Sequence, residues 1–274
     1  MPKFTTFDGL LLHYEDEGTG LPILCLSGLT RNSRDFDYVA PHLDDVRLIR
    51  MDYRGRGQSD FGDWHSYTVP NEARDALALL DHLGLARAAI LGTSRGGLIA
   101  MLLGAQAPER LIGVALNDIG PELNISGLGR IMDYLGKPPA FASRADMTAA
   151  MPHVSAGFAD VPAARWAQHV ERSTTELPEG GLGLAYDPHL RDAVIEGSAQ
   201  PAPDMWPLFN ALIGKPLALI RGANSDLLTA EAAQKMQAAD PDMIMANVAG
   251  RAHVPFLDEP EALTALNEWI ARCR

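Results

Sequence analysis

The sequence predicts an α/β protein with a mostly parallel central sheet flanked by helices, and with a helical insertion between two of its strands. Short continuous apolar runs alternate along the chain with segments of helical spacing, except between residues 120 and 210. Continuous apolar runs are typical of strands buried on both faces, as in parallel sheets. Their alternation with helices predicts crossover connections between parallel strands, which are right-handed in nearly all proteins.

The expected strands begin with a hairpin at the N-terminus. Phe4 to Phe7 and Leu10 to Tyr14 flank Asp8-Gly9, a pair that is typical of a tight turn between two strands. The buried strands are expected to follow in the apolar runs LPILCLSG (21–28), VRLIRM (46–51), ARAAILGTS (86–94), LIGVALND (111–118), PLALIRGANSD (216–226) and DMIMANVAG (242–250).

Helices are expected between these strands. In the segment 71–85, alanine and leucine recur at helical spacing, and Gly84 marks the C-terminal end. The segments 98–107, 229–239 and 260–273 show the same kind of pattern.

The stretch from 120 to 210 has no clean buried strand and is rich in Pro, Gly, Ala, Met and aromatic residues. We interpret it as a mostly helical cap, residues 120–210, inserted into a core domain formed by residues 1–119 and 211–274. Trp166 and Trp206 are candidates to line a substrate cavity beneath the cap, and the alternative is that they only pack the cap onto the sheet.

Composition excludes several functions. The chain has 274 residues, of which 47% are hydrophobic, and a net charge of −12, which argues against non-specific binding to nucleic acid or to anionic membranes. No apolar run approaches the roughly 20 residues of a membrane helix, and the N-terminus lacks the apolar core of a signal peptide. Its two cysteines show no metal-binding spacing. We expect a soluble, cytoplasmic protein without metal or organic cofactor.

The heptapeptide LGTSRGG (91–97) carries the main functional signal. It directly follows the apolar run AAIL and directly precedes an apolar helix, so Ser94 lies on a strand–turn–helix junction. Gly92 and Gly96 allow strand and helix to approach closely, and the turn exposes the Ser94 hydroxyl. The sequence therefore predicts that Ser94 is a nucleophile.

A serine nucleophile needs a base, and the base needs an orienting acid. Of the eight histidines, only His253 follows the end of an expected parallel strand, where sites form in α/β proteins. Two acids follow strand ends: Asp226 in RGANSD and Asp118 in LND. We favour Asp226, for its position after its strand and for the chain order Ser–Asp–His, and keep Asp118 as the alternative.

Two backbone amides are expected to stabilise an oxyanion. The amide of Arg95 lies at the N-terminus of the helix after Ser94, and the amide of Leu29 lies in the loop LSGLTRN (26–32). Gly28 gives this loop backbone freedom and is expected to border the substrate.

With these features the chain resembles the α/β-hydrolase fold superfamily, in particular its capped members with a serine nucleophile. The resemblance rests on the segments 52–59 (DYRGRGQS), 92–97 (GTSRGG), 222–226 (GANSD) and 249–253 (AGRAH), and it covers the whole chain except residues 120–210. Two positions depart from the pattern. Ser27-Gly28 stands where His-Gly is frequent, and Arg95 stands where an apolar residue or Gln is usual. We expect the Arg95 guanidinium to pair with a nearby carboxylate; the alternative is recognition of an acidic group on the substrate or cap.

The resemblance implies a serine hydrolase that cleaves a small ester or lactone through an acyl-enzyme. Haloalkane dehalogenases and epoxide hydrolases of this fold carry Asp at the position of Ser94, so serine favours acyl transfer. One alternative is a carbon–carbon bond hydrolase of ring-fission products, whose carboxylates would suit Arg95 and a basic cap pocket with Arg172 or Arg191. The others, on fold-level analogy alone, are a cofactor-free lyase or oxygenase and a ligand receptor.

Overall fold

The computed structural model describes residues 2–199 and 203–274, and a single eight-stranded sheet organises them. Only β1 and β2, at one edge, run antiparallel to their neighbours; the remaining strands are parallel, which confirms the predicted fold class. The strands stand in the order β1 (Lys3–Thr5), β2 (Leu11–Gly18), β4 (Val46–Met51), β3 (Leu21–Leu26), β5 (Ala88–Thr93), β6 (Leu111–Asn117), β9 (Leu217–Gly222) and β10 (Ile244–Val248).

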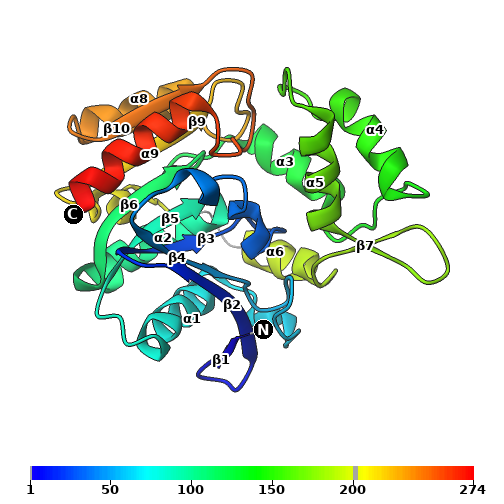
Figure 1. Cartoon of the computed structure of the whole chain (residues 1–274), viewed down its shortest axis with the longest axis horizontal. Coiled ribbons are helices and arrows are strands. Elements are labelled where there is room, and N and C mark those ends of the chain that lie inside the picture. Colours follow the sequence, from blue (N-terminus) through cyan, green and yellow to red (C-terminus); the bar gives the residue numbers. More distant parts are fainter. Residues whose placement is uncertain (1, 200–202) are drawn as a thin grey trace.

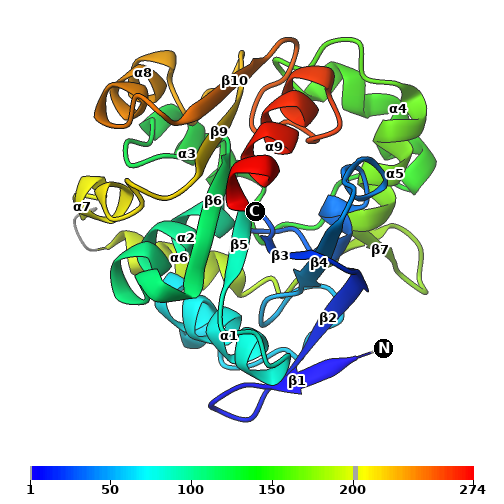
Figure 2. The ribbon, with the colours of Figure 1, turned by 60° about the vertical axis from the view of Figure 1, so that its left-hand side comes forward.

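The central strands are apolar throughout because both of their faces are covered. In β5, Ala88 and Ile90 point into one hydrophobic core, and Ala89 and Leu91 point into the other. The first core is closed by helices α1 (Val69–His82), α2 (Arg95–Gln106) and α8 (Ala230–Ala239), and the second by α9 (Pro260–Cys273). Figures 1 and 2 show the sheet between these helical layers.

The segment between β6 and β9 is mostly helical, and it also carries a two-stranded sheet that the sequence did not reveal. Helices α4 and α5 pack against each other beside the main sheet in Figure 1. The elements are α3 (Ile125–Tyr134), α4 (Arg144–Val154), α5 (Ala163–Ser173), β7 (Thr174–Glu176), β8 (Leu182–Leu184), α6 (Leu190–Ser198) and α7 (Trp206–Asn210).

The last of these helices, α7, packs against α2, and its Phe209 is buried in the first core. The division into a core and a cap at residues 120–210 stays a prediction, and residues 200–202 of that segment lie outside the described residues. Short 3-10 helices connect other elements: Ser33–Phe36, Ala40–His42, Trp64–Ser66 and Pro108–Arg110.

The turn after β4 contains two arginines that are fully buried. Arg54 donates to both carboxylate oxygens of Asp75 on α1, at 2.7 Å each. The guanidinium of Arg56 lies 3.0 Å from the carboxylate of Glu72 on the same helix. Each charge therefore has an opposite charge beside it in the interior, as burial requires. These contacts fix the turn to α1, whose Glu72 also contacts Arg95 at the start of α2.

Candidate active site

Ser94 lies on the sharp turn that joins β5 to α2. Its backbone has φ 50° and ψ −110°, a conformation that L-residues rarely adopt. A Cβ on Gly92 would stand 2.6 Å from the carbonyl oxygen of Gly96, so the turn needs glycine there. The Ser94 amide donates to the carbonyl of Asn117 at 3.0 Å, which ties the turn to the neighbouring strand β6. The sequence pattern therefore reflects a close approach of strand and helix.

His253 lies in the loop between β10 and α9 and links two side chains. Its Nε2 lies 2.9 Å from the hydroxyl oxygen of Ser94, and its Nδ1 lies 2.8 Å from Oδ2 of Asp118. In the neutral ring, Nδ1–H donates to the carboxylate, which leaves Nε2 to accept the serine proton. The three residues come from the ends of three different strands, β5, β6 and β10, and form one continuous hydrogen-bonded chain.

The acid of this chain is Asp118, so our choice of Asp226 was wrong. Asp118 is fully buried, and its Oδ1 accepts from the amide of Gly222 at 2.8 Å. The hydroxyl of Ser225 donates to Oδ2 at 2.6 Å, the same oxygen that His253 contacts. Asp226, the next residue, instead pairs with Arg130 on α3 at 3.2 Å. Because β6 and β9 are adjacent and parallel, both candidate acids follow neighbouring strand ends, and strand position alone could not separate them.

Of the two expected amide donors, Arg95 directly follows Ser94, and Leu29 directly follows Gly28, which lies beside Ser94. Within the described part of the chain, neither amide has a hydrogen-bond partner. The carbonyl of Gly28 accepts from the Arg31 amide at 3.1 Å, so the trans peptide points the Leu29 N–H the opposite way. The carbonyl of Ser27 accepts from the Gly96 amide at 3.1 Å and holds this loop against the start of α2.

The side chain of Arg95 points to the protein interior and makes structural contacts. Its Nε donates to Glu72 at 2.5 Å, and its Nη2 donates to the carbonyl of Tyr67 at 2.9 Å. This is the carboxylate pairing that we expected, and it leaves the alternative of substrate recognition by this side chain without support.

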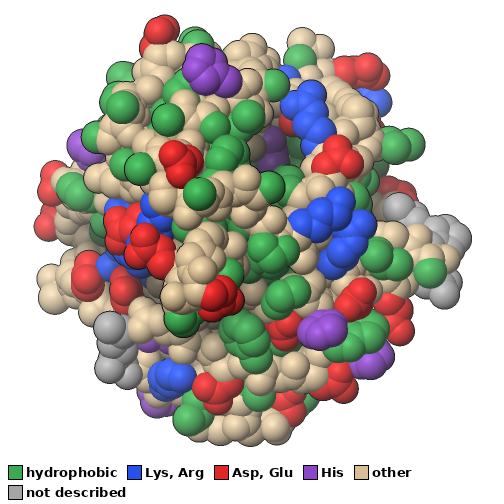
Figure 3. Space-filling view, turned by 90° about the vertical axis from the view of Figure 1, so that its right-hand side faces the viewer, with side chains coloured by type: hydrophobic (Ala, Val, Ile, Leu, Met, Phe, Trp, Pro, Cys, Tyr) green, Lys and Arg blue, Asp and Glu red, His purple; other side chains and the backbone are tan. Residues whose placement is uncertain are grey.

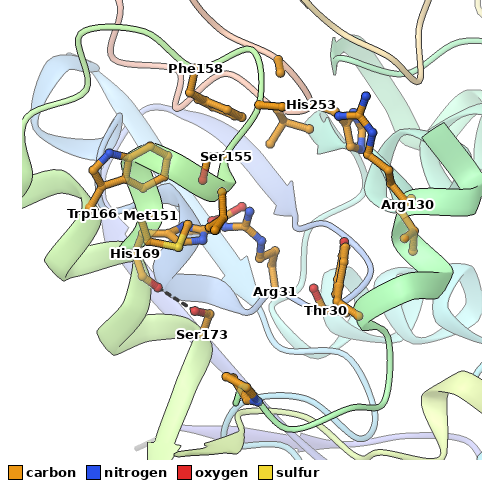
Figure 4. A pocket seen from close by; sticks show the side chains of 18 of the residues that line it. Thr30, Arg31, Arg130, Met151, Ser155, Phe158, Trp166, His169, Ser173 and His253 are labelled. Carbon is orange, nitrogen blue, oxygen red and sulfur yellow. Dashed lines mark hydrogen bonds and ion pairs between the residues drawn. The ribbon is translucent and has the colours of Figure 1, made fainter. Parts of the chain in front are cut away.

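A cavity of about 720 Å³ opens beside His253, between the strand ends and helices α3, α4 and α5 (Figure 4). Its size suits a small organic ligand. Figure 3 looks onto this side of the molecule, where hydrophobic and charged side chains surround a hollow. Its polar and aromatic lining includes Thr30, Arg31, Arg130, Tyr134, Trp166, His169, Phe158 and His253.

The structure places the three expected substrate-binding residues differently. Trp166 on α5 is buried and lines the cavity. Gly28 stands beside Ser94, since a Cβ there would lie 3.9 Å from Cβ of Ser94. Trp206 lies outside the cavity, where its indole donates to Glu122 at 2.9 Å and packs on Phe209. Trp206 therefore does not line this cavity, contrary to our expectation.

Two polar residues of the cavity, Arg31 and His169, escaped the sequence analysis. Arg31 could have been found, since it lies two residues after Leu29 in the same loop. His169 gave no such signal, because no sequence motif connects helix α5 to the strand ends.

Within residues 2–199 and 203–274, no three His, Cys, Asp or Glu side chains gather in a way that could hold a metal ion. None of the helices described is both long and apolar enough to cross a membrane.

Residues 22–156 match the family model of the alpha/beta hydrolase fold. A 3-hydroxybutyrate-oligomer hydrolase from Cupriavidus necator is 34% identical over 248 residues, covering 87% of this chain and 84% of that protein. A 2-(acetamidomethylene)succinate hydrolase from Mesorhizobium japonicum is 25% identical over 264 residues, covering 95% and 92%. The crystal structure of an α/β hydrolase from Novosphingobium aromaticivorans, 36% identical, matches 99% of this chain and 97% of its own with a TM-score of 0.90. The chain therefore belongs to the α/β hydrolase fold family and is a hydrolase.

Proposed function

We propose that this protein hydrolyses carboxylic esters through an acyl-enzyme on Ser94. The observation that carries the proposal is the continuous chain from the Ser94 hydroxyl through His253 to the buried Asp118, with distances of 2.9 and 2.8 Å. The strained backbone of Ser94 supports it, because such strain persists only where the surrounding structure holds it and is frequent at active sites.

In the proposed reaction, His253 removes the proton from Ser94 as the hydroxyl oxygen attacks the ester carbonyl carbon. The amides of Leu29 and Arg95 donate to the oxyanion that forms. As the carbon–oxygen bond breaks, the imidazolium gives its proton to the leaving alcohol. Water, deprotonated by His253, then attacks the acyl carbon and releases the acid and the free serine. Asp118 holds the Nδ1–H tautomer and stabilises the imidazolium in both halves of the reaction.

As substrate class we propose short oligoesters of hydroxy acids, with simple esters and lactones as further substrates. The 3-hydroxybutyrate-oligomer hydrolase from Cupriavidus necator, 34% identical over most of both chains, supports this class. The cavity of about 720 Å³ has room for more than a minimal ester. A carbon–carbon bond hydrolase would use the same serine and histidine, so a ring-fission product belongs in the substrate panel.

The test is covalent labelling with a fluorophosphonate probe, read as intact mass. Wild-type protein is expected to gain one adduct, because the probe phosphonylates only a serine that has been activated by its base. The variant Ser94→Ala is expected to gain none while keeping the circular dichroism spectrum of the wild type. Hydrolysis of the 3-hydroxybutyrate dimer, measured in parallel, is expected in the wild type alone.

An adduct of equal size on Ser94→Ala would contradict the proposal, because another residue would then be the nucleophile. Hydrolysis of the dimer by that variant at the wild-type rate would contradict it independently of the probe.

Ser225 is expected to act on the reaction through Asp118. Its hydroxyl donates to the oxygen of Asp118 that also faces His253. Ser225→Ala removes one hydrogen bond to the carboxylate, so we expect kcat to fall about tenfold and KM to change little. Steady-state kinetics on the 3-hydroxybutyrate dimer measure kcat and KM. The matched control is Ser126→Ala, on the exposed side of α3. A rise in KM with kcat unchanged would instead mean that Ser225 contacts substrate.

A further inference from the structure

The cavity contains one arginine with an unused hydrogen-bonding edge. Arg31 lines the cavity, and its side chain is 27% exposed. Its Nη1 donates to Asp35 at 3.0 Å and to Nδ1 of His169 at 3.1 Å. In the described part of the chain, its Nε and Nη2 donate no hydrogen bond. These two nitrogens form the planar fork that a carboxylate matches with two parallel hydrogen bonds.

Two other arginines of this protein use that same fork to hold a carboxylate. Nε and Nη2 of Arg47 donate to the two oxygens of Asp16, at 2.8 and 2.7 Å. Nε and Nη2 of Arg54 donate to the two oxygens of Asp75, at 2.7 Å each. Arg31 lines the cavity, and no carboxylate among the described residues hydrogen-bonds to its equivalent edge, which leaves this edge available to the carboxylate of a ligand.

His169 contacts the same guanidinium at Nη1, outside this edge. Because an arginine N–H can only donate, Nδ1 of His169 must accept from Arg31, and the ring proton is therefore on Nε2. Burial, and then the charges of Arg31 and Arg172, hold the pKa of His169 well below its ordinary value, so the ring is neutral. Its Nε2–H has no acceptor among the residues described, and the ring belongs to the cavity lining.

Arg31 also begins close to the reacting serine. A Cβ placed on Gly28 would lie 3.3 Å from Cγ of Arg31 and 3.9 Å from Cβ of Ser94. The guanidinium is therefore within reach of a group that lies only a few bonds from an ester carbonyl bound at Ser94. In an oligomer of 3-hydroxybutyrate, the terminal carboxylate lies at such a spacing from the last ester bond.

We infer that Arg31, with His169 beside it, binds the free carboxylate of the substrate and thereby selects esters that carry one a few bonds from the scissile bond. This inference rests on the proposed ester hydrolysis and names the determinant of its substrate choice. The fork of Arg31 would hold the two carboxylate oxygens, while Nδ1 of His169 accepts from Nη1 on the opposite side of the guanidinium. Asp35 keeps the guanidinium in place through Nη1 when the cavity is empty.

The experiment compares two substrates that differ only at this end. One is the 3-hydroxybutyrate dimer with its free carboxylate, and the other is the same dimer ending in a carboxamide, which has nearly the same shape and no charge. Wild-type protein is expected to prefer the acid in kcat/KM. In Arg31→Gln this preference is expected to fall about 10- to 100-fold, mainly through KM, because a bidentate charged contact is lost.

Two further variants make the result specific. Arg34→Gln removes one positive charge from the same segment, outside the cavity, where Arg34 pairs with Glu171 at 3.2 Å, and it is expected to keep the preference. Arg31→Lys keeps the positive charge beside Asp35 but lacks the fork, so it is expected to lose most of the preference for the acid. Because it keeps the ion pair with Asp35, it also tests the inference if Arg31→Gln folds poorly.

Each other outcome separates the inference from the proposed function. Equal hydrolysis of acid and amide by the wild type, dependent on Ser94, would overturn the role of Arg31 and leave the ester hydrolase standing. Loss of the preference in Arg130→Gln rather than in Arg31→Gln would overturn it as well, since Arg130 also lines the cavity. Hydrolysis of neither dimer, with no adduct on Ser94, would overturn the proposed function itself.

Discussion

Replacing Asp118 with Asn is expected to lower kcat for ester hydrolysis by about 10³- to 10⁴-fold, although the two side chains have nearly the same shape. Oδ1 of Asp118 accepts from the backbone amide of Gly222 at 2.8 Å, a donor that cannot turn away. The amide oxygen of an asparagine would therefore take the Oδ1 position. Its NH2 group would then face Nδ1 of His253, which lies 2.8 Å from the present oxygen.

An NH2 group in that position imposes the wrong histidine tautomer. It donates to Nδ1, so the ring proton moves to Nε2, and Nε2 can no longer accept the proton of Ser94. The loss is therefore expected in kcat, with the fluorophosphonate adduct forming correspondingly more slowly. Steady-state kinetics and the rate of labelling, measured on the same preparation, check this.

The matched control is Asp226→Asn, one residue from Ser225 in the same loop. Asp226 pairs with Arg130, whose side chain is 58% exposed, and exposed ion pairs contribute little. The kcat of Asp226→Asn is expected to stay within about threefold of that of the wild type. A large loss in Asp226→Asn together with a small loss in Asp118→Asn would show that the loop rearranges and that Asp226 is the functional acid.

These two carboxylates also show how far the sequence could lead. The fold was predictable because each central strand packs its alternate residues into one of two cores, which makes the strand apolar throughout. Ser94 and His253 were predictable because they follow strand ends at one edge of a parallel sheet. The partner of His253 could not be predicted, because Asp118 and Asp226 follow neighbouring strands, β6 and β9. Asp118 has a positive φ of 55°, a backbone conformation that the sequence did not indicate, and its side chain contacts His253.

The cavity was the least predictable part, for a different reason. Arg31 and His169 are 138 residues apart and meet only because α5 lies against the loop that follows β3. Neither belongs to a motif with fixed spacing, so only the three-dimensional structure brings them together. Trp166 and Trp206 were equivalent candidates in the sequence, yet one lines the cavity and the other hydrogen-bonds to Glu122.

The largest effect on stability is expected from Glu72, which lies on α1 and is fully buried. Its Oε2 accepts from Nε of Arg95 at 2.5 Å, and its Oε1 lies 3.0 Å from Nη2 of Arg56, within ion-pair distance but without hydrogen-bond alignment. One carboxylate thus stands between two arginines, and Arg56 is fully buried as well. Glu72→Gln keeps the shape of the side chain but removes its negative charge. Among the described residues, Glu72 is the only carboxylate that pairs with both Arg56 and Arg95.

Removing one partner of a buried ion pair costs about 3–5 kcal/mol, because the remaining charge stays in the interior without compensation. We expect Glu72→Gln to lower the free energy of unfolding by that amount, measured by urea denaturation with circular dichroism. The matched control is Asp81→Asn near the end of the same helix, where Asp81 is 67% exposed and pairs with Arg110. That variant is expected to cost less than about 1 kcal/mol.

The same variant connects stability to the active site. Arg95 directly follows Ser94, and its backbone amide is one of the two proposed oxyanion donors. Without the ion pair to Glu72, the side chain of Arg95 is held less firmly, and we expect its backbone amide to be less well positioned. Glu72→Gln is therefore expected to reduce kcat even at temperatures where the protein remains folded, with the labelled fraction of Ser94 unchanged at long times. If Glu72→Gln were as stable as the wild type, the ion pairs of Glu72 with Arg56 and Arg95 would contribute no net stability, and the prediction would be wrong.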